Sequence, residues 1–369
     1  MKFSCKKEQL VHAVQIVQKA VSSKPQMPIL SGIYLNAFDN TLELQATDYE
    51  LGISCKIDAQ IDEPGAIVLS GRYFQEVVRR LPGEMVEIVT NREDHTLKIT
   101  SNTAQFNLLS LPAAEFPVLY PLEGTTTFKI RDNVFRELIK KTVFACSQDE
   151  ARPVFTGGLL EVTNSDVMMV ATNTHRLAIK KEYLDEFNGE IKIIIPSKIL
   201  MELARIMVSE VPSDVVVNCT RNQISFTFDN VYIISRLIEG QFPDYKRVIP
   251  EEFATEIILN TDAFSSAVER VSLISRSGDY NVIRLSFNEK SVMITSNNPD
   301  IGKAEESVDI ALSGKELDIA FNAKYVTDIL KNIDCEKIYF SLNTPLSPAS
   351  IRPCDDDTYN YIITPVRTS

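Results

Sequence analysis

The chain carries one pattern of strands and helices three times, and this repeat limits its fold more than any other feature. An apolar strand followed directly by an amphipathic helix occurs at 65–82, 190–207 and 316–333. Ser70, Pro196 and Asn322 hold equivalent places in the three copies and are 126 residues apart. This regular spacing predicts three domains of similar fold rather than one large core.

A second unit, made of a short strand, a polar stretch and a helix, recurs at 1–21, 127–146 and 255–274. The pairs Phe116-Pro117 and Phe242-Pro243 close the first two copies and are again 126 residues apart. We therefore expect three domains, at 1–125, 126–252 and 253–369.

Each copy contains its own doubled pattern, in which a strand and a helix are followed by strands of alternating polarity. Segments with the two-residue period of a half-buried strand occur at 41–46, 97–100, 223–228 and 291–295. Turns rich in Asn and Asp, such as 39–40 and 229–230, separate the strands. The fold class is therefore α+β, with two helices packed on antiparallel sheets in each domain. The first helix has an apolar stripe for that packing, formed by Leu10, Ala13, Val14 and Val17.

The net charge of −12 argues at first against a nucleic-acid partner, but the charge is unevenly distributed along the chain. The six predicted helices are 6–21, 71–81, 131–145, 197–208, 261–276 and 322–333. Together they hold 16 Lys or Arg and 8 Asp or Glu, which leaves a net −20 on the remaining sequence. If equivalent helices face one way, they form a mildly positive surface that attracts a phosphate backbone without reading bases.

The candidate DNA-binding residues are basic residues on these helices or on the loops that follow them. They are Lys24, Arg72, Arg79, Arg80, Arg136, Lys140, Lys141, Arg152, Lys198 and Arg205, with Lys6, Lys7 and Lys19 on the first helix. A solvated helix face is the simpler interpretation for any single residue, so the inference rests on the summed asymmetry. The segment 261–276 is neutral and adds nothing to it.

No catalytic constellation is visible in the sequence. We find no G-x-S-x-G, no Gly-rich phosphate loop, no H-E-x-x-H and no C-x-x-C, and the six cysteines have no close pair in the sequence. We therefore expect no catalytic site, metal or cofactor, and reduced thiols. The start of the chain is polar and no run of about 18 apolar residues occurs, so we expect a cytoplasmic protein.

One segment, Ala-Thr-Asn-Thr-His-Arg-Leu at 171–177, has the composition of a binding site. Its equivalents at 46–48 and 295–297 predict a turn shared by the three copies. Only the second copy places His175, Arg176 and Leu177 after that turn. A hydrolase with His175 as its base is conceivable, but the sequence offers no nucleophile beside it.

Several stretches are similar to one known family along the whole chain. They include Met1-Lys2-Phe3, Met27-Pro28-Ile29-Leu30 and the segments 110–117, 171–178, 242–245, 321–322 and 364–367. With the repeats in register, the chain resembles the bacterial DNA polymerase III beta subunit family, the sliding clamps.

The resemblance implies a non-catalytic processivity factor that acts as a ring-shaped homodimer of six domains. Helices would line a central hole that encircles double-stranded DNA without sequence specificity, and sheets would lie outside. The partners it implies are the replicative DNA polymerase, the clamp loader, other polymerases and repair proteins, all bound through short peptide motifs; no membrane is involved.

The resemblance also assigns a peptide-binding cleft and a dimer interface. The cleft residues are Thr172, His175, Arg176, Leu177, Pro243, Arg247, Val248, Asn322, Tyr325, Leu346, Pro365, Val366 and Arg367. Leu177, Val248, Leu346 and Val366 would form its apolar floor, and His175, Arg176 and Arg367 its polar rim. The dimer interface would contain Phe106, Leu108, Leu273 and Ile274.

The sequence departs from the family pattern at three places. Asn173-Thr174 stands where the family has Asp-Gly in the 171–177 segment. Thr364 and Val366 replace methionines of some members, and Thr103 and Gln105 replace basic residues at the presumed dimer edge. Backbone pairing and apolar contacts would therefore contribute more of that interface.

Two other functions stay open on the sequence. One is a peptide-binding scaffold with the same repeats that does not act on DNA, and the other is an enzyme centred on His175. The charge asymmetry of the helices favours the clamp over the scaffold, and the missing nucleophile counts against the enzyme.

Overall fold

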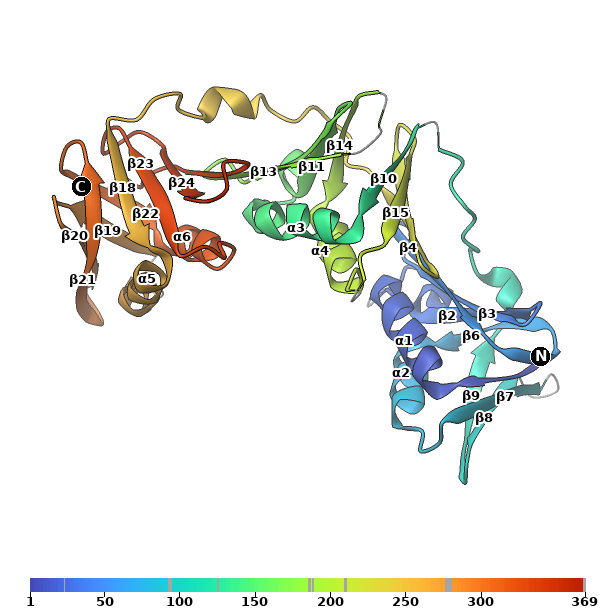
Figure 1. Ribbon diagram of the computed structural model, residues 1–369. Helices are drawn as coiled ribbons and strands as arrows, with labels where there is room; N and C mark the ends of the chain where they lie inside the picture. Colours follow the sequence, from blue (N-terminus) through green and yellow to red (C-terminus); the bar gives the residue numbers. More distant parts are fainter. Residues whose placement is uncertain are drawn as a thin grey trace. The chain divides into compact units, whose positions relative to one another are not determined.

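The computed structural model describes residues 1–22, 24–91, 95–124, 126–184, 187, 189–208, 211–275 and 281–367. Figure 1 shows the elements of this part of the chain. The first copy consists of β1 (Lys2–Lys6), α1 (Lys7–Val17), β2 (Gly32–Phe38), β3 (Thr41–Thr47), β4 (Leu51–Asp58), β5 (Gln60–Glu63), β6 (Gly65–Ser70), α2 (Gly71–Arg80), β7 (Met85–Asn91), β8 (Thr96–Ser101) and β9 (Ala104–Leu111).

The second copy repeats this order. Its elements are β10 (Thr126–Arg131), α3 (Asp132–Thr142), β11 (Gly157–Val162), β12 (Asp166–Thr172), β13 (Arg176–Tyr183), β14 (Ile191–Pro196), α4 (Ser197–Ile206), β15 (Asp214–Cys219), β16 (Gln223–Phe228) and β17 (Val231–Arg236). The third copy consists of β18 (Thr255–Asn260), α5 (Thr261–Ser275), β19 (Val282–Phe287), β20 (Ser291–Asn298), β21 (Gly302–Ser313), β22 (Leu317–Asn322), α6 (Ala323–Leu330), β23 (Lys337–Leu342), β24 (Ala349–Pro353) and β25 (Tyr359–Ile363).

The repeat predicted from the sequence is therefore present as a structural repeat. Strand, helix, strands, strand, helix and strands follow one another three times, and an α-helix stands in each of the six predicted segments. Some helices are shorter than predicted. The first α-helix ends at Val17 and continues as a single 3₁₀ turn at Gln18–Ala20, where the pattern predicted a helix to residue 21.

The chain divides into two compact units, and the second copy contributes to both. One unit contains Met1–Asn133 and Arg205–Leu237, and the other contains Val134–Ala204 and Ile238–Ser369. Each unit is built on one antiparallel sheet. The strand order is β10-β15-β16-β17-β4-β3-β2-β6-β9-β8-β7-β1-β5 in the first unit and β14-β11-β12-β13-β25-β24-β23-β18-β21-β20-β19-β22 in the second.

Strands of neighbouring copies pair directly inside each unit. In the first unit β17 pairs with β4, from Val231 opposite Cys55 to Ser235 opposite Leu51. In the second unit β13 pairs with β25, from Arg176 opposite Ile363 to Lys180 opposite Tyr359. An edge strand left unpaired exposes a row of backbone donors and acceptors, so each copy covers an edge of the next.

The helices pack on the sheets through the apolar faces that the sequence indicated. In α1, the residues Leu10, Ala13, Val14 and Val17 are all buried. This helix contacts α2 and the strands β3 and β4, and in the third copy α5 contacts α6 in the same way (Figure 1). Phe264 of α5 meets Phe340 of β23 edge to face, with ring centroids 6.2 Å apart.

Inside the two sheets, the strands β9 and β21 each leave part of one edge unpaired among the described residues. On β9, only Ser110 and Leu111 pair with β6, so the segment 104–109 has a neighbour on one side alone. On β21, the segment 302–309 pairs with β20, and only residues 310–313 pair with β18. No helix in the described ranges is long and apolar enough to cross a membrane.

Candidate functional site

The turn between β12 and β13 is held by the side chains of the 171–177 segment. The Asn173 Oδ1 atom accepts hydrogen bonds from the backbone N–H groups of His175 and Arg176, both at 3.1 Å. The Thr172 hydroxyl accepts from the N–H of Thr174 at 3.1 Å and donates to the Arg176 carbonyl at 2.6 Å. Thr174 has a φ of +77°, a left-handed conformation that is unfavourable for a β-branched residue.

The first copy contains the same turn, as the sequence predicted. There Asp48 accepts from the N–H groups of Glu50 and Leu51, and the Thr47 hydroxyl accepts from the N–H of Tyr49. Tyr49 has the equivalent positive φ, +72°. Asn173 and Asp48 accept the same pair of hydrogen bonds. The asparagine that this chain has in the second copy, where the family has aspartate, therefore keeps the turn intact.

The prediction of that turn in the third copy was wrong. The segment 295–297 lies inside β20, and the chain turns only after it, where the Asn298 side chain accepts from the N–H of Asp300 at 3.0 Å. Thr295, Ser296 and Asn297 have the composition of a turn, but they stay in the strand because they pair with β21.

Arg176 is a buried residue and does not form the polar rim that we expected. Only 6% of its surface is exposed. Its guanidinium donates to Asp328 Oδ2 of α6 at 2.6 Å and to the Phe144 carbonyl at 2.5 Å. It also lies over the Tyr325 ring, 4.5 Å from the ring centroid. The residue therefore joins the second copy to the helix α6 of the third copy.

His175 remains exposed, and its backbone holds the end of the chain. The His175 carbonyl accepts from both the N–H and the hydroxyl of Thr364, each at 2.9 Å. Two positions further on, the N–H of Val366 donates to the carbonyl of Ala320 at 2.8 Å. These bonds place the segment 364–366 between the 171–177 turn and β22.

The remaining cleft residues differ in how much of each is exposed. Leu177 is only 3% exposed and belongs to an apolar cluster with Val170, Phe242, Tyr245 and Ile362. Val248 and Leu346 are large apolar residues that are 51% and 64% exposed. Pro243, Arg247 and Arg367 are also exposed, whereas Thr172, Asn322, Tyr325, Pro365 and Val366 are half-buried.

Two of the predicted cleft residues have roles within the chain. The Asn322 side chain caps α6 and accepts from the N–H groups of Lys324 and Tyr325, at 3.0 and 3.4 Å. Arg247 pairs with Asp244 at 2.8 Å. The structure thus brings Thr172, His175, Arg176, Tyr325 and Thr364 together through direct contacts.

A polar pocket adjoins this group of residues, and the sequence did not predict several of its walls. Its lining includes Arg152, His175, Arg176, Tyr325, Phe144, Lys324 and Asp328. The last three come from α6 and from the turn after α3. Their spacing carried no motif; Phe144 and Asp328 are identified by their contacts with Arg176, and Lys324 only by its place in the pocket wall.

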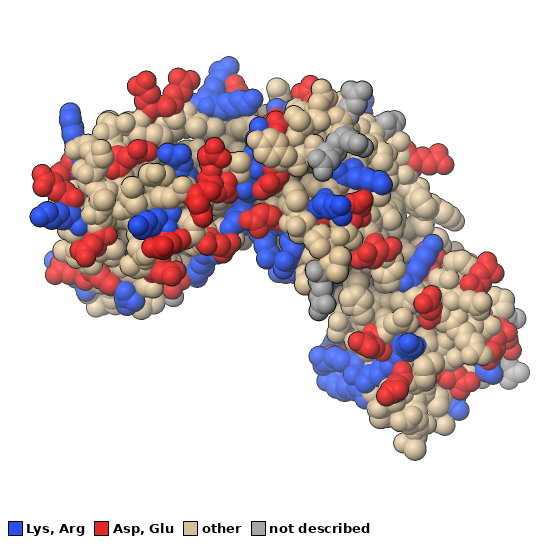
Figure 2. Space-filling view, in the orientation of Figure 1, with Lys and Arg blue, Asp and Glu red and all other residues tan. Residues whose placement is uncertain are grey.

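The candidate DNA-binding residues are mostly exposed. Lys24, Arg72, Arg79, Arg80, Lys140, Arg152, Lys198 and Arg205 are exposed, and Arg136 is half-buried with its Nε donating to the Ala204 carbonyl at 3.1 Å. Figure 2 shows Lys and Arg side chains gathered over α1 and α2 of the first copy. Glu76 lies among them and pairs with both Arg79 and Arg80.

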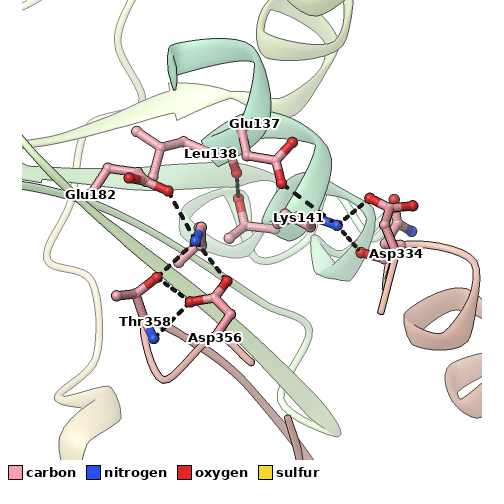
Figure 3. Close-up of polar contacts among 10 residues, drawn as sticks. Glu137, Leu138, Lys141, Glu182, Asp334, Asp356 and Thr358 are labelled. Carbon is pink, nitrogen blue, oxygen red and sulfur yellow. Dashed lines mark hydrogen bonds and ion pairs between the residues drawn. The ribbon is translucent and has the colours of Figure 1, made fainter. Parts of the chain in front are cut away.

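Lys141 is not the exposed cation that the charge count suggested. It is 7% exposed, and its ammonium group contacts Asp334 Oδ2 at 2.7 Å, the Asn332 carbonyl at 2.6 Å and Glu137 at 3.5 Å (Figure 3). The neighbouring Lys140 is exposed. Since successive helical residues point in different directions, a count of basic residues cannot separate the two.

Two of the predicted dimer residues lie on the partly unpaired strand β9, and the other two lie on α5, which contacts β21. Phe106 of β9 is 39% exposed and Leu273 of α5 is 56% exposed. Leu108 and Ile274 are half-buried. Among the described residues, no group of three or more His, Cys, Asp and Glu side chains is arranged to hold a metal ion.

Comparisons with known proteins match this architecture along its full length. Three models of the DNA polymerase III beta subunit match in order: the N-terminal domain at residues 1–120, the central domain at 129–244 and the C-terminal domain at 246–367. The chain is 39% identical over 381 residues to the beta sliding clamp of Bacillus subtilis (strain 168), and the alignment covers 100% of both.

Solved structures of the same kind superpose closely on this chain. The crystal structure of the DNA polymerase sliding clamp from Bacillus subtilis has a TM-score of 0.95 at 38% identity, with 100% of both chains covered. A sliding clamp from Pseudomonas aeruginosa, solved bound to griselimycin, has a TM-score of 0.94 at 30% identity and the same coverage.

The strained turn gives a prediction about stability. Thr174→Gly should raise the free energy of unfolding by about 1 kcal/mol. Glycine adopts the left-handed conformation without strain, and this gain exceeds the entropy that glycine adds to the unfolded chain. Urea denaturation measures this change. Thr103→Gly serves as the control and should lower stability, because Thr103 lies in a hairpin turn but its own φ is not positive. An equal loss in both variants would show that Thr174 is not strained.

Proposed function

Because the chain belongs to the DNA polymerase III beta subunit family, we propose that it works as a DNA sliding clamp and polymerase processivity factor. In this proposal two copies close into a ring around double-stranded DNA and hold the replicative polymerase there. The ordered match of three family domains to nearly the whole chain carries the proposal. We place the domains at 1–125, 126–252 and 253–369.

The free strand edges support a homodimer. The edge of β9 at 104–109 in one copy would pair with the edge of β21 at 302–309 in the other, with Phe106 and Leu108 against Leu273 and Ile274. Arg270 and Glu306 already form a two-point ion pair within the chain, at 2.9 and 2.5 Å. Since the Glu306 carboxylate has its own cation, it needs no basic partner at Thr103 or Gln105.

The exposed basic residues of the helices support contact with DNA. Their contribution would be counterion release along the phosphate backbone, which has no preference for sequence. The proposed DNA-binding residues are Lys24, Arg72, Arg79, Arg80, Arg136, Lys140, Arg152, Lys198 and Arg205. A ring retains DNA by its topology, so these contacts can stay weak enough for the protein to slide.

The cleft residues support recognition of short peptides. Exposed Val248 and Leu346 offer apolar contacts, with Val366 and Pro365 beside them in the proposed cleft, while His175, Arg247 and Arg367 offer polar ones. Thr172, Leu177, Asn322 and Tyr325 would shape its walls, and Arg176 would hold them from beneath. The ligand of the Pseudomonas aeruginosa clamp agrees with a ligand site in this family.

We further propose that the protein is not an enzyme and works in the cytoplasm, where the polymerase, the clamp loader, other polymerases and repair proteins would bind it in turn. Among the described residues, no Ser, Thr or Cys side chain forms a hydrogen bond with the exposed His175 side chain, which leaves the hydrolase alternative without support. The alternative is a peptide-binding scaffold that does not bind DNA, and the experiment below distinguishes it from a clamp.

Retention on DNA gives a test of the ring. Clamps loaded onto nicked circular DNA should stay bound at a salt concentration that removes ordinary electrostatic binders, and should leave when a restriction enzyme linearises the circle. Gel filtration of the complex before and after cutting measures this. Retention that is equal on circular and linear DNA would contradict a ring.

The apolar cleft residues give a second test. Val248→Asp and Leu346→Asp should each reduce stimulation of DNA synthesis by the cognate polymerase at least about tenfold, since central anchors contribute 2 kcal/mol or more to an interface. The solution mass and DNA retention should not change. Met85→Asp is the matched control, because Met85 is 51% exposed and lies outside both the cleft and the proposed dimer edge. Equal loss in the control would sink the cleft assignment.

A further inference from the structure

Two cysteines that are distant in the sequence meet in the third copy. The Cys335 thiol and the Cys354 backbone N–H both donate to the carbonyl of Lys337, at 2.9 and 3.0 Å. The Cys335 sulfur therefore lies within two hydrogen-bond lengths of the Cys354 backbone. Cys354 is exposed and Cys335 is partly exposed. Our expectation of cysteines without a close pair holds along the sequence but not in space.

The Cys335 thiol also affects the pKa of the Cys354 thiol. Partial burial raises the pKa of the Cys354 thiol, and the neighbouring Cys335 raises it further. The other four cysteines are buried, and burial raises the pKa of Cys5, Cys55 and Cys146 to about 12. Because the thiolate is the reactive form and needs access to solvent, only the 335 and 354 pair is placed to react.

Cys335 and Cys354 lie in or next to two segments whose aspartates form ion pairs with buried lysines of the second copy. Figure 3 shows these ion pairs. Cys335 directly follows Asp334, which contacts the ammonium group of Lys141 at 2.7 Å. Cys354 lies two residues before Asp356, which contacts the ammonium group of Lys180 at 2.8 Å.

Both lysines are charged groups that have been taken out of water. Lys141 is 7% and Lys180 is 5% exposed. Lys180 also contacts Glu182 at 2.9 Å and the Thr358 hydroxyl at 2.7 Å. Asp334 and Asp356 each compensate part of the charge of a buried lysine, so the positions of segments 332–335 and 354–358 affect how the third copy packs against the second.

We propose that Cys335 and Cys354 form a reversible disulfide within the chain when it meets a low-molecular-weight disulfide, and that this bond ties the two lysine-holding segments together. The inference does not depend on the proposed function.

The disulfide forms through two successive thiol–disulfide exchanges. One protein thiolate attacks a sulfur of glutathione disulfide, which breaks that S–S bond, forms a mixed disulfide and releases one glutathione thiolate. The second protein thiolate then attacks the protein sulfur of the mixed disulfide and expels the second glutathione. The two protein thiols are oxidised, glutathione disulfide is reduced by two electrons, and the two thiol protons end on the released glutathione.

The disulfide should stabilise the folded chain. A cross-link lowers the entropy of the unfolded state, and here it joins segments that are already adjacent in the folded state. Because the reacting group is a thiolate and the pKa of Cys354 is raised, the reaction should also be faster at pH 9 than at pH 7.

The test uses the full chain incubated with glutathione disulfide, then alkylated and mapped by mass spectrometry. We expect one peptide pair joined through Cys335 and Cys354, with the four buried cysteines still reduced. Cys335→Ser and Cys354→Ser should each give a single glutathione adduct on the remaining exposed thiol. Separate adducts on both cysteines of the unaltered chain, a bond between two chains, or no reaction at either cysteine would each overturn the proposal.

Thermal unfolding tests the structural consequence. The oxidised chain should melt several degrees higher than the reduced chain, and dithiothreitol should abolish the difference. The double variant Cys335→Ser/Cys354→Ser should melt at one temperature with or without glutathione disulfide. If the cross-linked chain melts at the same temperature as the reduced chain or at a lower one, the disulfide does not stabilise the packing of the two lysine-holding segments, and that part of the proposal is wrong.

Discussion

Backbone pairing between neighbouring copies is the interaction on which the rest of the structure depends. A repeated domain built on antiparallel strands exposes unpaired edges, and such edges pair with whatever strand is available. Here the ladders of β4 with β17 and of β13 with β25 cover edges of successive copies. The second ladder also brings parts of the candidate cleft together. It places the end of β25 at the 171–177 turn, where Thr364 forms a hydrogen bond with His175.

Buried charges add a second constraint at the junction of the second and third copies. Arg176 with Asp328, Lys180 with Asp356 and Lys141 with Asp334 all join residues of the two copies. Buried ion pairs are costly to desolvate, and they contribute little net stability compared with apolar packing. Their geometry is nevertheless specific, because each buried cation contacts partners from both copies at the same time. We infer that these pairs define how α6 and β25 sit against the second copy.

The repeat, the α+β class, the six helices and most of the strands followed from spacing and polarity alone, since these depend on local pattern. The cleft could be assigned only through resemblance to a family, because its residues come from segments as distant as Thr172 and Val366. Three details lay beyond the sequence. Burial of Lys141 and Arg176 depends on tertiary partners, the third-copy turn depends on register in β20, and the approach of Cys335 to Cys354 depends on the pairing of β23 with β24.

The account predicts that the unpaired segments of β9 and β21 are covered by a second copy of the chain. Sedimentation equilibrium at micromolar concentration tests this most directly, because it reports mass without assuming a shape. We expect a single species with twice the mass of the chain. A stable monomer over the same concentration range would contradict the ring on which the proposed function rests.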